Sequence, residues 1–261
     1  MSKPSLKLSN IIYLLANMPV KKTKEVSLII PAFNEEKTIK SILDRCFSLD
    51  YVKQIVVVND GSTDNTKEIL EKIKESRRHK SVELFIVHHT LNSGKGAAIK
   101  TGLKYVNGEY VMIQDADLEY SPEDVKNLLI EANRSEDKIV FGSRGHNKRK
   151  SYFLALLGNY YLSLMFNILF NYRLEDSYTC YKLIPRKIWK ELNLKSTGFE
   201  IDSELIAKLG VRGYEIREVP ISYKPRTYKE GKKIKWTDLL KASLVAFEIR
   251  MGIFPQNRGS A

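Results

Sequence analysis

The chain has 261 residues, with 43 Lys and Arg against 31 Asp and Glu, and a formal net charge of +12 at pH 7. Its hydrophobic content of 43% is ordinary for a globular protein with a buried core, so the composition excludes a disordered chain. The positive charge indicates an anionic partner: a phosphorylated substrate, an acidic membrane surface or nucleic acid.

From residue 26 onwards, apolar strand-like runs alternate with amphipathic helical runs. The pattern predicts strands at residues 26–30, 54–58, 82–87, 110–113 and 138–142, and helices at 36–49, 66–75, 96–106 and 122–132. This alternation predicts an α/β fold with a mostly parallel central sheet flanked by helices. In open α/β sheets, ligands bind at the carboxyl ends of the strands, and the polar motifs of this chain fall at such ends.

After residue 143 the pattern weakens into a decorated C-terminal third. It contains a basic loop, an apolar stretch at 151–172, and expected helices near 200–212 and 236–254 around a strand at 214–223. Asn159, Ser163 and Asn167 interrupt the apolar stretch, which makes it a poor transmembrane span. Two interpretations stay open for it: a buried core helix, or a helix lying along a membrane surface.

The chain divides most simply into three parts. Residues 1–23 form an expected N-terminal amphipathic extension, 24–240 a single domain, and 241–261 a C-terminal amphipathic tail. A secretory signal is not expected, because the short apolar stretch near the N-terminus is followed by lysines rather than by a small-residue cleavage site. Cys46 and Cys180 lack metal-site spacing, and two cysteines are too few for a disulfide scaffold, which favours a reducing, cytoplasmic setting.

The stretch MIQDADLEYSP at 112–122 places three carboxylates, Asp115, Asp117 and Glu119, directly after a predicted strand. Carboxylates this close repel one another unless a cation lies between them. If the segment is extended, alternate positions share one face and can present oxygens to Mg²⁺ or Mn²⁺, which prefer carboxylates together with substrate phosphates. A solvated acidic loop is the alternative, but the apolar strand before it favours a metal site.

Three further motifs are weaker when taken singly. In PAFNEE at 31–36 the acids suit an ordinary helix start. In VVVNDGSTDNT at 56–66, Asp60 lies at a strand tip, where it can accept hydrogen bonds from a nucleotide base or ribose. LNSGKGAAIKTG at 91–102 lacks the spacing of a phosphate-binding P-loop, which leaves a Gly-rich helix start whose Lys95 suits close packing against a ligand.

Taken together, PAFNEE, NDGSTD, NSGKGAA, QDADLEYSP and GSR resemble, in order and spacing, the family 2 glycosyltransferases with a GT-A fold. Within that family they resemble the polyprenyl-phosphate sugar synthases, such as the dolichyl-phosphate mannose and glucose synthases. The resemblance covers roughly residues 24–240. Phe33 stands where Tyr is common in the family, and Asn59 stands where Asp is usual. These two departures leave open which nucleotide base the site prefers, and they do not remove a predicted catalytic residue.

The resemblance implies a role for particular side chains. The nucleotide-sugar pocket is expected to be lined by Pro31, Ala32, Phe33, Glu35, Asp60, Lys95, Asp115 and Ala116. The metal ligands are expected to be Asp115 and Asp117 as the DxD pair, with Glu119 close by. The expected catalytic residues are Asp117, Arg144 and Asp176, the last lying near the sugar.

The basic segment 224–235 resembles a mobile loop near the acceptor. With Arg144, its Arg226, Lys232 and Lys233 are expected to receive the acceptor phosphate. A solvated basic turn is the other interpretation of this segment.

The implied reaction is the inverting, metal-dependent transfer of a hexose from a UDP- or GDP-sugar to a polyprenyl (dolichyl or undecaprenyl) phosphate. A phosphate acceptor is already anionic near neutral pH, so no strong general base is needed. Apolar faces beside Lys and Arg then predict a peripheral protein on the cytoplasmic face of a membrane. Oligomeric state and the identity of the hexose stay open.

Three alternatives remain. A family 2 transferase could act on a saccharide hydroxyl in cell-wall or surface polysaccharide synthesis, with Asp176 as its base. A nucleotide-sugar-binding module without activity is disfavoured by the intact acidic triplet. A nucleic-acid-binding protein is not expected, because aromatic side chains are not interleaved with the basic runs.

Overall fold

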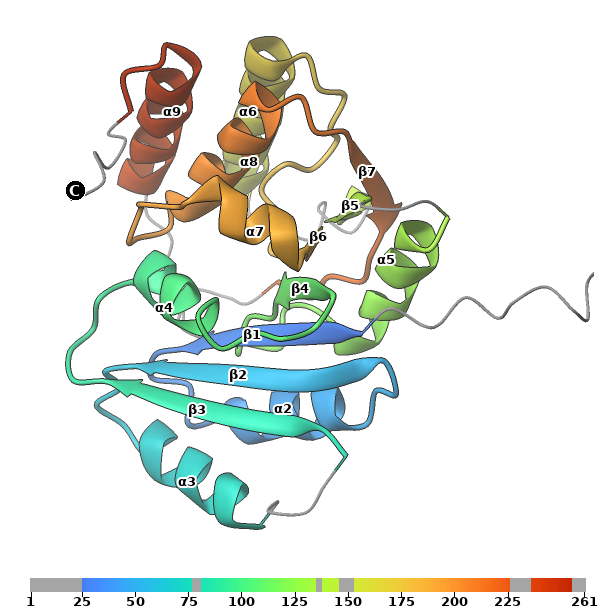
Figure 1. The fold of residues 1–261 in the computed structure, drawn as a ribbon. Coiled ribbons are helices and arrows are strands. Elements are labelled where there is room, and N and C mark those ends of the chain that lie inside the picture. The colour runs from blue at the N-terminus through green and yellow to red at the C-terminus, as the bar shows by residue number, and fades with distance from the viewer. Residues whose placement is uncertain (1–24, 77–80, 135–137, 146–152, 226–235, 255–261) are drawn as a thin grey trace, which may run out of the picture.

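The computed structural model describes residues 25–76, 81–134, 138–145, 153–225 and 236–254, and Figure 1 shows their arrangement. They form one seven-stranded sheet in the order β3-β2-β1-β4-β6-β5-β7, flanked by helices. The strands are β1 (Val26–Ala32), β2 (Val52–Asp60), β3 (Glu83–His89), β4 (Tyr110–Ile113), β5 (Ile139–Ser143), β6 (Lys182–Pro185) and β7 (Ile216–Pro220). The helices are α2 (Ile39–Phe47), α3 (Thr66–Ser76), α4 (Lys95–Gly102), the 3₁₀ turn η1 (Pro122–Asp124), α5 (Val125–Ala132), α6 (Phe153–Phe170), α7 (Arg186–Leu192), α8 (Ile201–Val211) and α9 (Trp236–Arg250).

The sheet is mixed but mostly parallel, as the sequence predicts. Strand β1 pairs in parallel with β2 and β4, β2 pairs in parallel with β3, and β5 pairs in parallel with β7. Strand β6 is antiparallel to both β4 and β5, and it joins the two parallel groups. All four residues of β6 are buried, so no polar alternation marks this strand in the sequence.

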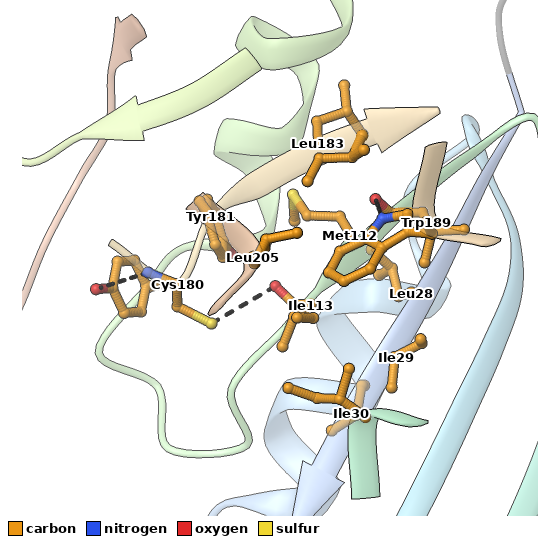
Figure 2. Packing of buried hydrophobic residues seen from close by; sticks show 14 of the residues in the cluster. Leu28, Ile29, Ile30, Met112, Ile113, Cys180, Tyr181, Leu183, Trp189 and Leu205 are labelled. Atoms are coloured by element: carbon orange, nitrogen blue, oxygen red, sulfur yellow. Dashed lines mark hydrogen bonds between the residues drawn. The ribbon is translucent and has the colours of Figure 1, made fainter. Parts of the chain in front are cut away.

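The core lies on the central strands and on the stripes of the helices that cover them. Strands β1 and β4 are almost wholly buried, as expected for strands covered on both faces. In Figure 2, Leu28, Met112 and Leu183, from β1, β4 and β6, pack beside Trp189 of α7. The Trp189 indole Nε1–H donates to the Val111 carbonyl oxygen at 3.2 Å, so the buried ring keeps a polar partner.

Helices α6, α8 and α9 pack against one another beside β5 and β7 (Figure 1). One face of α6 buries Leu162 and Phe166, while Tyr160 and Ile168 on the other face are 69% and 73% exposed. The helix is therefore not simply a buried core helix. No helix in the part of the chain that the structure describes is long and apolar enough to cross a membrane.

The expected boundary between residues 240 and 241 falls inside α9, which starts at Trp236. Four α9 residues beyond that boundary are buried: Ala242, Val245, Ala246 and Ile249. Through residue 250 this segment therefore belongs to the packed domain. The expected extension at 1–23 lies outside the described residues.

Candidate functional site

The site lies at the carboxyl ends of β1, β2 and β4, where the predicted motifs fall. The turn after β1 is tied to the turn after β2 by side-chain hydrogen bonds. The Asn34 N–H donates to Ser62 Oγ at 3.0 Å, and Asn34 Oδ1 accepts from the Thr63 N–H at 2.8 Å. Glu35 is buried, and its Oε2 accepts from the Thr38 hydroxyl at 2.8 Å. Glu35 thus braces the start of α2.

The second motif residue, Asp60, is buried at the tip of β2. Its Oδ1 accepts hydrogen bonds from the Ser93 N–H at 3.0 Å and from His89 Nδ1 at 2.7 Å. Its Oδ2 accepts from the Gly94 N–H at 2.8 Å. The carboxylate therefore holds the turn that leads into α4, and Lys95 is the first residue of that helix.

Gly94 is required in this turn for two reasons. Its φ is +96°, a conformation that side chains rarely adopt, and an added Cβ would lie 2.4 Å from the Thr197 carbonyl oxygen. The Ala97 N–H also donates to that carbonyl oxygen at 3.0 Å. The start of α4 is thus hydrogen-bonded on one side to Asp60 and on the other to the segment before α8.

Lys95 belongs to a partly buried series of alternating charges. Its Nζ lies 3.0 Å from Asp115 Oδ1 and 3.9 Å from Asp202 Oδ2, and Asp202 Oδ1 lies 2.7 Å from Lys182 Nζ. Burial is the largest single influence and would by itself raise the pKa of Asp115, but the Lys95 ammonium, the Cys180 thiol and Lys182 together outweigh it, and the pKa is lowered. Burial likewise acts most strongly, to lower the pKa of Lys95, but Asp115, Cys180 and Asp202 together reverse this effect, so the pKa of Lys95 is raised. Both groups are held in the charged form.

Asp202 and Lys182 are not among the site residues predicted from the sequence. The signal that could have found Asp202 is its position in the first turn of α8, whose neighbours Ile201, Leu205 and Ile206 are buried. An acid in a helix buried on nearly all sides needs a partner. Lys182 in the short strand β6 carries no comparable signal.

The acidic motif is not extended. Residues 116 and 117 form a turn, and Leu118 has φ +62°. Asp117 Oδ1 accepts from the Glu119 N–H at 3.1 Å, and Glu119 Oε2 accepts from the Tyr223 hydroxyl at 3.0 Å. The prediction of an extended segment, with all three carboxylates on one face, is therefore wrong.

The described ranges contain no group of three or more His, Cys, Asp or Glu side chains that could hold a metal ion. The donor chemistry nevertheless suits Mg²⁺ or Mn²⁺, because these ions often bind through one or two carboxylates and complete their shell with phosphate oxygens and water. Asp115 and Asp117 supply such oxygens directly after β4. The residues present thus fit a metal shared with a diphosphate, not a cage made by the protein alone.

Arg144, one residue beyond β5, is held by Asp176. The guanidinium donates from Nε to Asp176 Oδ2 and from Nη2 to Oδ1, both at 2.8 Å, and the Arg144 N–H donates to Oδ2 at 2.9 Å. Asn159 of α6 adds a donor to Oδ1 at 3.1 Å. Asp176 has 0% exposure, so in this arrangement it orients Arg144 and does not face a substrate.

Segment 176–180 contacts both Arg144 and Lys95. The Tyr178 carbonyl oxygen accepts from Arg144 Nη2 at 3.1 Å, and Cys180 Sγ lies 3.9 Å from Lys95 Nζ. Figure 2 shows the Cys180 thiol directed at the Ile113 carbonyl oxygen at the end of β4. The centre of the Arg144 guanidinium also lies 5.0 Å from the centroid of the Tyr223 ring.

The remaining predicted residues fall into two groups. Pro31 and Ala32 end β1, Phe33 follows that strand, and Ala116 is buried in the acidic turn, so all four lie at the expected edge. Arg226, Lys232 and Lys233 lie outside the described residues. Their expected role with the acceptor phosphate stays a prediction.

Comparison with known proteins agrees with this geometry. The family model described as "Glycosyl transferase family 2" matches residues 27–192. A dolichyl-phosphate beta-glucosyltransferase of Trichomonas vaginalis is 29% identical over 241 residues, covering 83% of this chain and 70% of that protein. A UDP-N-acetylglucosamine–dolichyl-phosphate N-acetylglucosaminyltransferase of Methanococcus voltae is 28% identical over 244 residues, covering 87% of this chain and 96% of that protein.

Among solved structures, glucosyl-3-phosphoglycerate synthase from Mycobacterium tuberculosis, in complex with Mg²⁺ and UDP, superposes with a TM-score of 0.63. The two chains are 20% identical, and the match covers 98% of this chain and 87% of that one. This likeness concerns the fold, which is that of the GT-A glycosyltransferases. Because the family model spans most of the sheet and the strand-end motifs, the chain belongs to glycosyl transferase family 2 and is a glycosyltransferase.

Proposed function

We propose that this enzyme transfers a hexose, with inversion, from a UDP- or GDP-sugar to a polyprenyl phosphate. The observation that carries this proposal is the pairing of Arg144 with a fully buried Asp176 beside the Lys95–Asp115 pair. A guanidinium held in this way offers a pre-oriented site for a phosphate. Two relatives are named for transfer to dolichyl phosphate, which supports the same acceptor class.

The enclosure of Asp176 by hydrogen-bond donors favours a phosphate over a saccharide hydroxyl as the acceptor. A hydroxyl needs a general base within reach, and Asp176 is enclosed by donors from Arg144 and Asn159. A phosphate monoester is already ionised near neutral pH and needs no base. Catalysis then consists of positioning the acceptor phosphate on the face of the sugar opposite the leaving diphosphate.

On the donor side, Asp60 and Lys95 bind the nucleotide sugar, and Asp115 and Asp117 hold Mg²⁺ or Mn²⁺. When bound, the metal neutralises charge that develops on the leaving diphosphate. Glu119, which the family resemblance places near the metal, is engaged by Tyr223 and steadies the acidic turn. Structures of the mycobacterial synthase with UDP and either Mg²⁺ or Mn²⁺ support a divalent ion without choosing between them.

A polyprenyl acceptor requires the enzyme to approach a bilayer, as a peripheral protein on its cytoplasmic face. Helix α6 exposes Leu157, Tyr160, Leu164 and Ile168, and α9 exposes Leu240, Leu244 and Phe247. Asn159 of α6 also contacts Asp176, so this apolar surface adjoins the proposed acceptor site. Apolar stripes with Tyr at their edge are typical of helices at a membrane interface.

The test incubates the protein with Mg²⁺ or Mn²⁺, radiolabelled UDP- and GDP-hexoses and a polyprenyl phosphate, and then measures label in the organic phase. We expect metal-dependent labelling with one donor. Asp117→Ala should abolish the labelling, whereas Asp44→Ala, which changes an exposed acid paired with Lys40 on α2, should leave it unchanged. Binding of a donor sugar without any label in the organic phase would refute the polyprenyl acceptor.

A further inference from the structure

Two adjacent histidines end the edge strand β3, and each faces a residue at the tip of β2. In the register of the sheet, His88 pairs with Asn59 and His89 with Asp60. Side chains alternate along a strand, so the two imidazoles point to opposite faces. His88 Nε2 lies 2.9 Å from Glu71 Oε1 of α3, whereas His89 Nε2 lies 2.9 Å from Thr101 Oγ1 of α4. Of the two, His89 alone contacts Asp60.

The chemistry of the pair fixes which nitrogen of His89 carries the proton. An ionised carboxylate only accepts hydrogen bonds, so His89 Nδ1–H donates to Asp60 Oδ1 across their 2.7 Å separation. In that tautomer, Nε2 accepts a hydrogen bond from the Thr101 hydroxyl at 2.9 Å. The imidazole is thereby held at both nitrogens, with 18% of its side chain exposed.

The same carboxylate orders the turn that leads to Lys95. Asp60 receives the Ser93 and Gly94 N–H groups, and Gly94 has no room for a side chain against Thr197. If Asp60 rotates, the two N–H groups lose their acceptor, and the turn that positions Lys95 loses its anchor. His89 is the side chain within hydrogen-bonding distance that resists this rotation.

We propose that His89 is a positioning residue of the donor site, which orients Asp60 and the 93–95 turn for a nucleoside diphosphate. This inference rests on the proposed function, in which Asp60 and Lys95 bind the nucleotide sugar. Asp60 Oδ2 receives one backbone donor, from Gly94, and a carboxylate oxygen has two lone pairs. A hydroxyl or N–H of the nucleotide can use the second lone pair once the carboxylate is held in this orientation.

Two substitutions of His89 separate this role from simple packing. The amide nitrogen of His89→Asn reaches roughly the position of Nδ1, so it can still donate to Asp60. The longer His89→Gln places its amide near Nε2, which keeps the contact with Thr101 and loses the one with Asp60. The dissociation constants for UDP and GDP are measured by calorimetry in Mg²⁺, together with the KM for the donor sugar and for the acceptor.

We expect His89→Gln to weaken nucleotide binding about tenfold and to raise the donor KM by a similar factor, with the acceptor KM unchanged. His89→Asn should stay within about threefold of the parent protein. His88→Asn keeps a polar group at the place of Nδ1, which lies 3.0 Å from the Asn59 amide, and gives up only the contact with Glu71 on the opposite face. It serves as the control for losing a histidine from β3, and its dissociation constants should not change.

Two outcomes would overturn the inference while the parent protein still binds nucleotide. One is a His89→Gln variant that binds as tightly as the parent. The other is an equal loss in the Asn and Gln variants, which would indicate a packing effect. If the parent protein binds neither UDP nor GDP, the proposed function itself is refuted, and the role of His89 at a donor site is refuted with it.

Discussion

At the scale of single residues, the hydrogen-bond partners of a buried charge determine which role that residue can have at the site. Asp176 is wholly buried, and a carboxylate out of water is costly unless it is paired and hydrogen-bonded. The bidentate bond with Arg144 and the amide of Asn159 provide those partners. In the proposed reaction, Asp176, which the family resemblance places near the sugar, therefore acts by orienting Arg144.

Asp176→Asn should destabilise the protein as well as impair transfer, because it leaves the Arg144 guanidinium buried without its counter-charge. We expect the free energy of unfolding to fall by about 3 kcal/mol and the acceptor KM to rise. Denaturant unfolding and steady-state kinetics measure the two effects. A variant of unchanged stability that loses only kcat would instead support a general base at this position.

Gly94 provides a second test at the residue scale, with Gly213 as its matched control. Both have positive φ, but a Cβ at Gly213 would meet nothing within 4 Å, whereas at Gly94 it would meet the Thr197 carbonyl. Gly213→Ala should cost about 1 kcal/mol, from backbone strain alone. Gly94→Ala should cost about 1 to 3 kcal/mol more and weaken nucleotide binding. Equal losses of unfolding free energy would show that the Thr197 contact adds no strain.

At the scale of elements, helix α2 is fastened to the turn η1 by an ion pair at the protein surface. Arg45 Nη2 lies 2.5 Å from Glu123 Oε2, and Arg45 Nε donates to Oε1 at 3.1 Å. This hydrogen bond with Arg45 lowers the pKa of Glu123 to about 2, from an ordinary value of 4.5. The pair joins the first βαβ unit to the segment that follows the acidic turn.

The lowered pKa makes this contact sensitive to acid. A carboxyl group with a depressed folded-state pKa stabilises the protein above its unfolded pKa, and this stabilisation is lost as the pH falls through the folded value. The contribution should therefore disappear between pH 4.5 and about 2. Because the Arg45 and Glu123 side chains are 36% and 52% exposed, water screens the pair, and we expect only about 0.5 to 1 kcal/mol.

The measurement compares unfolding free energies of the parent protein and Glu123→Gln across this pH range. The difference between them should be largest above pH 4.5 and vanish near pH 2. A difference that is constant with pH would contradict the ionic origin of the stabilisation.

At the scale of the whole molecule, the proposed nucleotide site and an exposed apolar surface lie on different elements of the fold. Asp60 ends β2, Lys95 begins α4 and Asp115 follows β4, whereas α6 and α9 lie beside the part of the sheet that holds β5 and β7 (Figure 1). Helices α6 and α9 both bury one face and expose apolar residues on the other. This division suits an enzyme that takes one substrate from water and the other from a bilayer.

Replacing exposed apolar residues on both helices should therefore weaken binding to membranes. For the double variant Ile168→Ser with Leu244→Ser, we expect the fraction bound to vesicles of anionic phospholipid to fall about tenfold or more, since each loses apolar area that the bilayer would bury. Ile130→Ser on α5 changes an equally apolar exposed residue on another element and should have no effect. Equal binding of all three proteins in a vesicle sedimentation assay would exclude this surface as the membrane contact.

The sequence by itself determined the alternation of strands and helices, the mostly parallel sheet, and the edge at which the site lies. These follow from local hydrophobic periodicity and from the rule that parallel strands present their carboxyl ends together. The strand-end motifs made Asp60, Lys95 and Asp115 candidates, and the family resemblance implied their roles at a nucleotide sugar. The structure brings Lys95 to both acids through a hydrogen-bonded turn and an ion pair.

Only the tertiary structure decided the direction of β6, the left-handed turn at Leu118, and the enclosure of Asp176 by Arg144 and Asn159. Asp176 lies 32 residues from Arg144 along the chain, and Asp60 lies 29 from His89. A local sequence pattern does not predict which distant donor will bind a buried carboxylate, because the packing of the whole sheet and its helices determines that partner.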